Sequence, residues 1–155
     1  MAEAAGRRRF LAVMAGAAAL PATLSGRAHA QVELRQIEPL IGALTGGAVA
    51  RTGRVTLALP QFVDNGNAVP VTITVDSPMT ANDHVKSIHL ISNRNPVAQM
   101  ASFYIGSRAG RAQLITRIRL AGSQTVTAVA ALSDGSFWMD SVSVVVTVSA
   151  CLDES

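Results

Sequence analysis

The residue best suited to chemistry is a single cysteine near the end of the chain, Cys151. It follows two small residues, Ser149 and Ala150, and precedes Leu152. A thiolate is a nucleophile, and chain ends are seldom packed, so this position suits a thiol that reaches another molecule better than one that fills a core. Position alone leaves open the alternative of an incidental terminal cysteine.

Histidines that could activate this thiol are scarce. A cysteine hydrolase needs a histidine base within reach of its nucleophile. Past the first 30 residues only His84 and His89 remain, and an odd spacing of five on one extended segment sends them to opposite faces. They therefore predict neither a catalytic pair nor a joint metal site, and an enzyme acting alone has little support.

Two arginines form a second candidate site. Arg117 and Arg119 are two residues apart in an extended pattern, so their side chains lie on the same side of the predicted strand. Guanidinium groups bind anions and carboxylates well. The pair predicts contact with an anion or an acidic partner, and the alternative is an ordinary solvated face.

The first 30 residues have the pattern of an export leader. Arg7, Arg8 and Arg9 precede an apolar run over residues 10–20, and Ala28-His29-Ala30 has the small-x-small pattern that a signal peptidase cleaves. The adjacent arginines followed by Phe10 and Leu11 favour a twin-arginine signal over a plain secretory leader. The apolar run is too short to span a bilayer, so we expect a periplasmic protein with no membrane span.

Removal of this leader leaves 125 residues, enough for one domain. The net charge of +3 belongs to the leader, because residues 31–155 contain nine basic and nine acidic residues. This balance argues against nucleic acid as a partner. The lone cysteine excludes an internal disulfide, so the core must depend on apolar packing.

The elements that position these residues are predominantly strands. Leu34, Ile37, Ile41 and Leu44 recur at helical spacing, which predicts a short helix over residues 38–45 that ends at Gly46-Gly47, with an extended linker as the alternative. Alternating apolar residues then predict strands over residues 55–59, 69–75, 85–92, 97–105, 112–120, 125–133 and 136–149. Met100, Phe103 and Tyr104 are expected in the core, and Val148 is expected on the buried side of the last strand.

Turn residues separate these strands. Asn65-Gly66 is predicted to supply a tight turn with positive φ, and Asp134-Gly135 predicts a hairpin before the long last strand. About seven strands with regular turns indicate an antiparallel β-sandwich of immunoglobulin type. The predicted organisation is a leader (1–30), a helical segment and linker (31–50), the sandwich (51–149) and a cysteine-bearing arm (150–155).

A series of short motifs resembles the SoxY family of sulfur-compound carriers from the bacterial thiosulfate-oxidising system. The resemblance spans about residues 31–151. In chain order the motifs are D-N-G-x-x-V-P-V (64–71), N-x-N-P (93–96), T-R-I-R-L-A (116–121), Q-x-V-x-A-V-A (124–130), S-D-G-S (133–136) and V-x-V-T-V-x-x-C (144–151).

This resemblance implies a carrier that is not itself an enzyme and needs no cofactor or resident metal. It implies that Cys151 binds thiosulfate-derived sulfur covalently, and that the sandwich forms a heterodimer with a SoxZ-like sandwich protein. It also implies transient visits to a haem-containing ligating enzyme, to a hydrolase that releases sulfate and, in some systems, to a sulfur dehydrogenase.

The arm departs from the family pattern. SoxY proteins carry glycine-glycine-cysteine-glycine-glycine, whereas this chain has Ser149-Ala150-Cys151-Leu152 followed by Asp153 and Glu154. Glycines let an arm enter a narrow active site, while Leu152 is bulky and the two acids disfavour a thiolate and repel thiosulfate. Two hypotheses follow: a periplasmic carrier with an unusual arm, or a non-covalent binding module that keeps the partner-binding fold without carrying sulfur.

Overall fold

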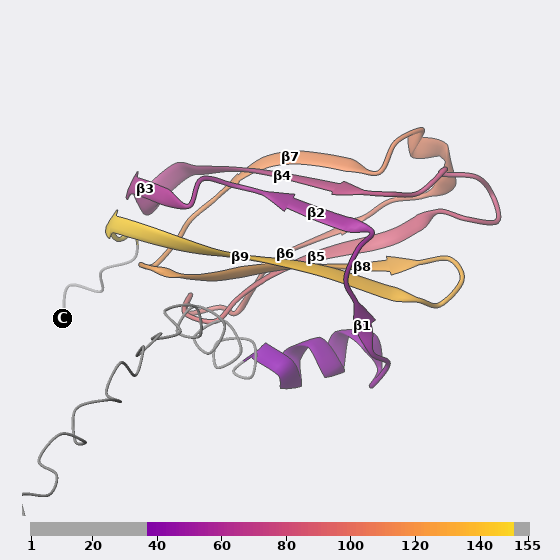
Figure 1. Ribbon diagram of the computed structural model, residues 1–155, viewed down its shortest axis with the longest axis horizontal. Helices are drawn as coiled ribbons and strands as arrows, with labels where there is room; N and C mark the ends of the chain where they lie inside the picture. The colour runs from indigo at the N-terminus through magenta and orange to yellow at the C-terminus, as the bar shows by residue number, and fades with distance from the viewer. Residues whose placement is uncertain (1–36, 151–155) are drawn as a thin grey trace, which may run out of the picture.

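The computed structural model describes residues 37–150, so the predicted leader lies outside the described part of the chain. Residues 37–45 are helical, and Figure 1 shows this helix below the layer that contains β9, β8 and β5. The strands of the described chain are β1 Ala50–Arg51, β2 Val55–Ala58, β3 Phe62–Asn65, β4 Val69–Val75, β5 Val85–Ser92, β6 Gln99–Tyr104, β7 Gln113–Ile118, β8 Gln124–Leu132 and β9 Phe137–Val148. Two single 3-10 turns lie at Gly66–Ala68 and Ser107–Ala109.

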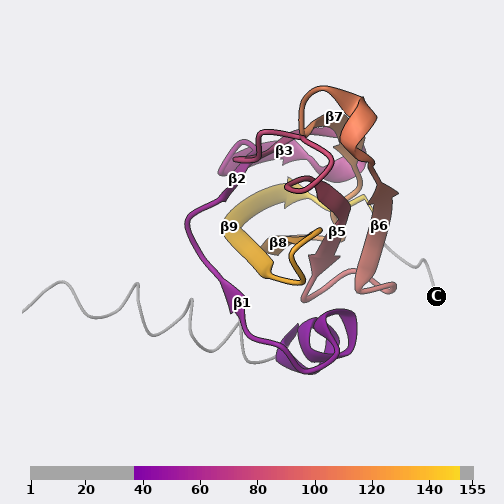
Figure 2. The same ribbon diagram turned by 90° about the vertical axis from the view of Figure 1, so that its right-hand side faces the viewer.

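These strands form two sheets that pack face to face (Figures 1 and 2). The larger sheet has six strands in the order β1-β9-β8-β5-β6, with β3 also paired to β9, and the smaller sheet has the order β2-β4-β7. This arrangement confirms the predicted all-β sandwich with a short helix before it.

Two strands that the sequence pattern did not predict lie along the free edge of β9. Strands β1 and β3 pair with β9 in parallel, whereas all the other pairings in the described chain are antiparallel. With two and four residues, they are too short for an alternating pattern to reveal them. The longer predicted strands agree with the structure to within two residues at either end, and β4 and β5 match their predicted bounds.

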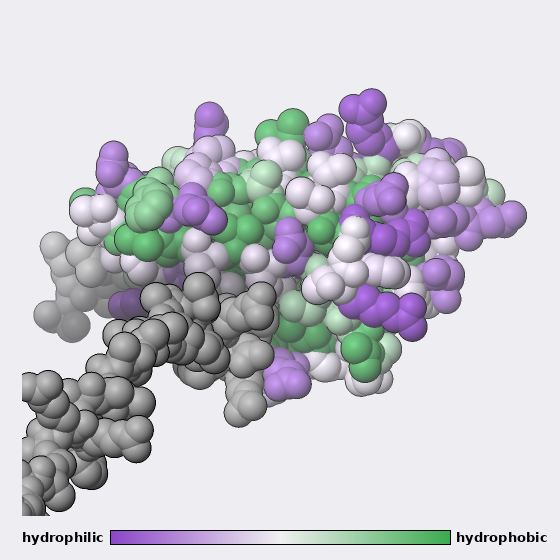
Figure 3. Space-filling model, viewed as in Figure 1, coloured by the Kyte–Doolittle hydropathy of each residue, from purple (hydrophilic) through white to green (hydrophobic). Residues whose placement is uncertain are grey.

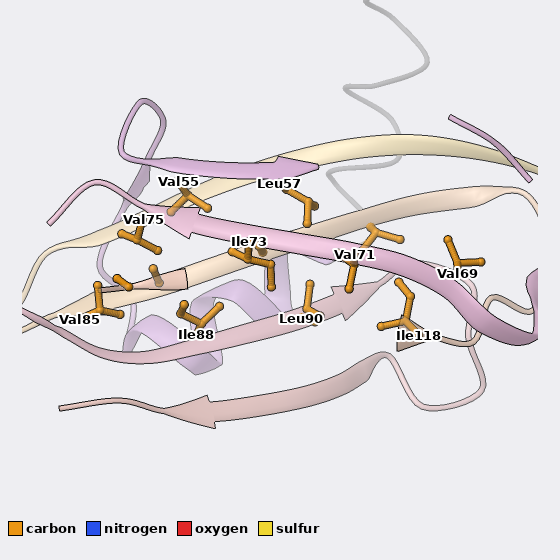
Figure 4. Packing of buried hydrophobic residues seen from close by; sticks show 14 of the residues in the cluster. Val55, Leu57, Val69, Val71, Ile73, Val75, Val85, Ile88, Leu90 and Ile118 are labelled. Carbon is orange, nitrogen blue, oxygen red and sulfur yellow. The ribbon is translucent and has the colours of Figure 1, made fainter. Parts of the chain in front are cut away.

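The main core lies between the two sheets. Strand β4 turns Val69, Val71, Ile73 and Val75 inward, where Figure 4 shows them facing β5. Fully burying an aliphatic side chain contributes about 1.5–3 kcal/mol. Apolar packing therefore stabilises a sandwich in which no internal disulfide can form.

Some residues expected to be buried are exposed instead. Tyr104, expected in the core with Met100 and Phe103, is 82% exposed, and Val148, expected on the buried side of the last strand, is 53% exposed. Met100 and Phe103 do pack against the core. Tyr104 alternates with Phe103 on β6, so it points outward, and Val148 is the last residue of β9.

The helix covers the outer face of the larger sheet. Ile37 forms a small buried cluster with Ile91 of β5 and Val129 of β8. This cover explains why β8 is buried on nearly every residue rather than on alternate ones. Gly46 and Gly47, both at positive φ, follow the last helical residue, as the sequence predicted for the helix stop.

The β8–β9 hairpin determines where the chain leaves the sandwich. Gly135 has φ of 84° and the Leu132 N–H donates to the Ser136 carbonyl over 3.0 Å, which confirms the predicted turn. Hydrogen bonds from the Ser136 side chain and backbone to the Asp134 carboxylate lower the pKa of Asp134. From this hairpin β9 runs back along β8, with Gln124, the first residue of β8, paired to Val144. The end of β9 therefore lies at the opposite end of the sandwich from the hairpin.

Candidate functional site

The described chain ends at a backbone anchor one residue before the predicted reactive cysteine. The Ala150 N–H donates to the Leu120 carbonyl oxygen, which lies in the loop between β7 and β8, over 3.0 Å. Ser149 and Ala150 are both half-buried. Cys151 and Leu152 lie outside the described residues. The fold therefore ties the base of the predicted arm to the β7–β8 loop.

Gly66 lies beneath this anchor. The Leu120 N–H donates to the Gly66 carbonyl over 2.9 Å, so Leu120 connects Gly66 and Ala150. A Cβ on residue 66 would overlap the Leu120 carbonyl oxygen and approach the Ala150 nitrogen to 3.2 Å. Gly66 does not have a positive φ, so that prediction is wrong. Glycine is needed here because the backbone of Leu120 approaches too closely for a side chain. Asn65 caps the following 3-10 turn by accepting from the Asn67 N–H.

Asn95 connects the two loops at this end of the sandwich. Its Nδ2 donates to the Arg119 carbonyl over 2.8 Å, and its Oδ1 accepts from the Ala121 N–H over 2.9 Å and from Gln124 Nε2 over 3.0 Å. The sequence marks Asn95 only as part of the N-x-N-P motif, a turn, and predicts no network around it. That motif was the available signal, since a short polar side chain between two turn residues is suited to bonding backbone groups.

Buried polar residues extend the Asn95 network. The Ser92 hydroxyl donates to Gln124 Oε1 and accepts from the backbone N–H groups of Arg94 and Asn95 over 3.1 Å each. Asn93 Oδ1 accepts from the Thr125 N–H over 3.0 Å. These bonds join the β5–β6 loop to the start of β8. Satisfied buried networks of this kind make a loop rigid.

Ser123 fixes the last part of β9 to the same loop. Its hydroxyl accepts from the Val146 N–H over 3.0 Å and lies 3.4 Å from the Val146 carbonyl oxygen. Arg94 Nη1 donates to the Ser123 carbonyl over 3.4 Å. The exit of β9 is thus held before the chain reaches Ala150.

A groove of about 410 Å³ opens beside this anchor, between β6 of the larger sheet and β7 of the smaller one. Figure 2 shows both strands on one side of the sandwich, opposite β2. Apolar side chains from both strands and from the preceding loop line it, among them Val97, Met100, Phe103 and Ile118. Its size is in the usual range for a site that binds a small molecule or a peptide side chain.

Arg117 and Arg119 both line this groove and both are exposed. Arg117 lies in β7, but Arg119 lies one residue past the end of that strand, which differs from the prediction that both belong to it. Neither guanidinium has an ion-pair partner among residues 37–150. The structure thus brings the predicted arginine pair to a common groove, and Arg119 is adjacent in sequence to the residue that anchors Ala150.

The two histidines lie in separate environments. His84 precedes β5 rather than belonging to it, and its Nδ1 is 3.1 Å from the Thr80 carbonyl oxygen. His89 lies within 3.0 Å of the Ser87 and Ser102 hydroxyls, and its ring forms a T-shaped pair with the Tyr104 ring. Burial lowers the pKa of His89. Within the described residues no group of three His, Cys, Asp or Glu side chains could hold a metal ion.

Comparison with known proteins identifies a family and several proteins with a similar fold. The family model described as sulfur oxidation protein SoxY matches residues 41–151. The sulfur carrier protein SoxY from Chlorobium limicola f thiosulfatophilum is similar in structure, with a TM-score of 0.60 and 21% identity over 74% of this chain and 99% of that one. No curated protein matches this chain.

Superoxide reductases are also similar in structure. The neelaredoxin from Ignicoccus hospitalis has a TM-score of 0.54 and 14% identity over 61% of this chain and 80% of its own. The one from Archaeoglobus fulgidus has a TM-score of 0.52 and 13% identity over 63% and 99%. At such identities these likenesses concern the sandwich fold alone. In residues 37–150 no helix is long and apolar enough to cross a membrane.

Proposed function

We propose, because this chain belongs to the SoxY family, that it carries thiosulfate-derived sulfur covalently on Cys151 in the periplasm. Membership in the family supports a sulfur-carrier role. The single observation that carries the proposal is that the family match runs through residue 151 and so includes the only cysteine of the chain. In this proposal the protein presents sulfur to other enzymes and does not itself catalyse a reaction.

The backbone anchor supports this proposal. Ala150 is hydrogen-bonded to Leu120, and the loop that contains Leu120 is held by Asn95. A rigid base gives a short arm a defined starting point. Enzymes that dock on the sandwich would then meet the thiol at a high effective concentration, because the thiol is attached to the docked body.

Two covalent steps define the proposed cycle. Joining the Cys151 sulfur to the outer sulfur of thiosulfate forms an S–S bond, releases the thiol proton and removes two electrons, which a haem-containing partner enzyme would accept. Hydrolysis of the resulting S-thiosulfonate by a second partner enzyme then breaks the bond between sulfur and the sulfonate group. Water adds to that group to release sulfate and two protons, and a persulfide anion remains on Cys151.

The partner protein and the periplasmic location belong to the same proposal. The sandwich would form a heterodimer with a SoxZ-like sandwich protein, and the leader in residues 1–30 would export the chain. Figure 3 shows apolar surface around β3, and Phe62 of β3 and Val145 of β9, which are cross-strand partners, are 79% and 51% exposed. Exposed apolar surface of this kind is typical of protein interfaces.

A second candidate function is a non-covalent binding module whose thiol is never loaded. The observation that favours it is the tail that follows the cysteine, Leu152-Asp153-Glu154, where the family carries glycines. A bulky residue and two negative charges beside the thiol would hinder both entry into an active site and approach of thiosulfate.

The test is the intact mass of the protein isolated from the periplasm of thiosulfate-grown cells, measured with and without a reductant. We expect a reductant-sensitive gain that matches sulfur or thiosulfonate, maps to Cys151 and disappears in Cys151→Ser. A variant with the glycine arm serves as a loading control. If this control loads and the native chain remains a bare thiol, the carrier proposal is wrong and the binding module is favoured.

A further inference from the structure

We propose that the acidic tail after Cys151 docks in the groove between β6 and β7 of its own chain. Leu152 would lie against the apolar floor, and Asp153 and Glu154 would pair with Arg117 and Arg119. Docking would hold Cys151 between two fixed points, the anchored Ala150 and the bound Leu152. This docking does not require sulfur loading, but its consequence for cargo rests on the proposed function.

The groove has the apolar surface that such a tail needs. Val97, at its rim, is 70% exposed, and Met100 and Phe103 are only partly buried. A leucine side chain that covered them would remove apolar surface of both partners from water. A volume of about 410 Å³ accommodates one such side chain together with neighbouring backbone.

Charge complementarity indicates which segment occupies the groove. Arg117 and Arg119 lie two residues apart on the groove wall, and neither has an ion-pair partner within the described residues. The tail offers two adjacent carboxylates, Asp153 and Glu154. Guanidinium and carboxylate groups form paired hydrogen bonds that are stronger than those between neutral groups.

The tail begins next to a residue that is adjacent in sequence to the groove wall. The Ala150 N–H is bonded to Leu120, and Leu120 is adjacent in sequence to Arg119, whose side chain lines the groove. Asn95, which also lines the groove, holds the Arg119 carbonyl. An extended residue spans at most about 3.6 Å, so the five residues after Ala150 reach up to about 18 Å. Leu152 is the second of them, so it can lie up to about 7 Å from Ala150.

Docking would also change the surroundings of the thiol. In a free tail the two carboxylates would repel an anionic sulfur compound near Cys151. Once these carboxylates pair with Arg117 and Arg119, the negative charge beside the thiol would be offset and this repulsion would weaken. A carrier with this tail would therefore keep its cargo close to the sandwich until a partner enzyme displaced the tail.

Nuclear Overhauser contacts would test docking without any sulfur chemistry. The sample is isotope-labelled protein expressed from the full sequence, so that the leader is processed. The Cys151→Ser substitution prevents thiol dimers. At low salt we expect contacts between the Leu152 methyl groups and both the Met100 methyl group and the Phe103 ring. Their intensity should fall about five-fold or more in Arg117→Glu/Arg119→Glu and in high salt.

Two further variants make the test specific. Arg108→Glu/Arg111→Glu makes the same charge change at exposed arginines that do not line the groove, and it should leave the contacts at least half as strong as in the parent. Adding Asp153→Lys/Glu154→Lys to the Arg117→Glu/Arg119→Glu variant should restore them. This rescue shows that loss of the contacts is not caused by misfolding.

Three results would contradict the proposal. Absence of Leu152 contacts in the parent at low salt would refute docking. Unchanged contacts after reversal of Arg117 and Arg119 would refute the charge pairing. Contacts seen only between differently labelled molecules in a mixed sample would mean that the tail binds a second copy. Because loading is measured by mass and docking by these contacts, either proposal can fail alone.

Discussion

The two long sides of the sandwich are built differently. On one side the sheets are joined: the Asp140 carboxylate of β9 accepts from the Leu57 N–H of β2 over 2.9 Å, and the chain passes from β2 of the smaller sheet directly to β3, which pairs with β9 of the larger one. On the other side β6 and β7 are both sheet edges, and the groove with Arg117 and Arg119 lies between them. Figure 2 shows these two sides facing in opposite directions.

The joined side has further polar links. Arg54, which precedes β2, pairs with Asp83 at 3.4 Å, donates to the Asp76 carbonyl over 2.7 Å and lies 5.8 Å from the Trp138 ring centre. The charged groups of Arg54 and Asp140 therefore have their partners within the fold. On the open side Arg117 and Arg119 have no ion-pair partner among residues 37–150, so we infer that the polar links of the joined side stabilise the sandwich and that the groove of the open side is available to bind a charged segment.

The largest expected effect on stability is at Asn95, which connects the β5–β6 loop to the β7–β8 loop. Asn95→Ala should lower the free energy of unfolding by about 3 kcal/mol, because the Arg119 carbonyl, the Ala121 N–H and the Gln124 amide would lose their partner. Urea denaturation measures this change. The exposed Asn67→Ala is the matched control and should cost less than about 0.5 kcal/mol. Equal effects of the two substitutions would contradict the conclusion that the Asn95 hydrogen bonds stabilise the two loops.

A second substitution tests the backbone contact below the arm. Gly66→Ala should destabilise the protein by roughly 1–3 kcal/mol, because the added methyl group would overlap the Leu120 carbonyl oxygen. Gly42→Ala is the control: it lies in the helix with nothing near its missing side chain, and it should stabilise by about 0.5–1 kcal/mol. Thermal melting of both variants compares them, and a neutral Gly66→Ala would show that the loop yields without cost.

Asp140 permits a direct comparison of the two sides. Asp140→Ala removes the acceptor of the Leu57 N–H and should cost about 1–2 kcal/mol in urea denaturation, while Asp140→Asn keeps an acceptor oxygen and should recover part of it. On the open side, Arg117→Ala should change stability by less than about 0.5 kcal/mol. If Arg117→Ala were as destabilising as Asp140→Ala, the division between a joined side and an open side would be wrong.

The smallest expected effect is a pH dependence of stability at His89 of β5, the strand next to the edge strand β6. Burial lowers the pKa of His89, so folding favours its neutral form. As pH falls through about 6.5, the ordinary value for histidine, the unfolded chain binds the proton first and stability decreases, levelling off below the lowered pKa of the folded state. His89→Gln should therefore reduce the loss of stability between pH 8 and pH 5, as followed by urea denaturation. His84→Gln, the second-histidine control, should retain the loss caused by His89.

Much of the fold could be predicted because it depends on local pattern. The alternation in residues 69–75 and 85–92 marks β4 and β5, and Asp134-Gly135 marks the hairpin. Each of these signals lies within a few neighbouring residues. The motif series likewise indicates the SoxY family, and the amino-acid sequence alone makes the lone cysteine the evident candidate for chemistry.

The sequence by itself therefore determined the strand pattern, the family and the identity of the candidate thiol, because all three are properties of nearby residues. Only the tertiary structure decided that Asn95 joins two loops, that Gly66 lies against Leu120 and that Arg117 and Arg119 share a groove with β6. These contacts join residues far apart in the chain. Their geometry is determined by how the two sheets pack, and no local pattern of residues specifies it.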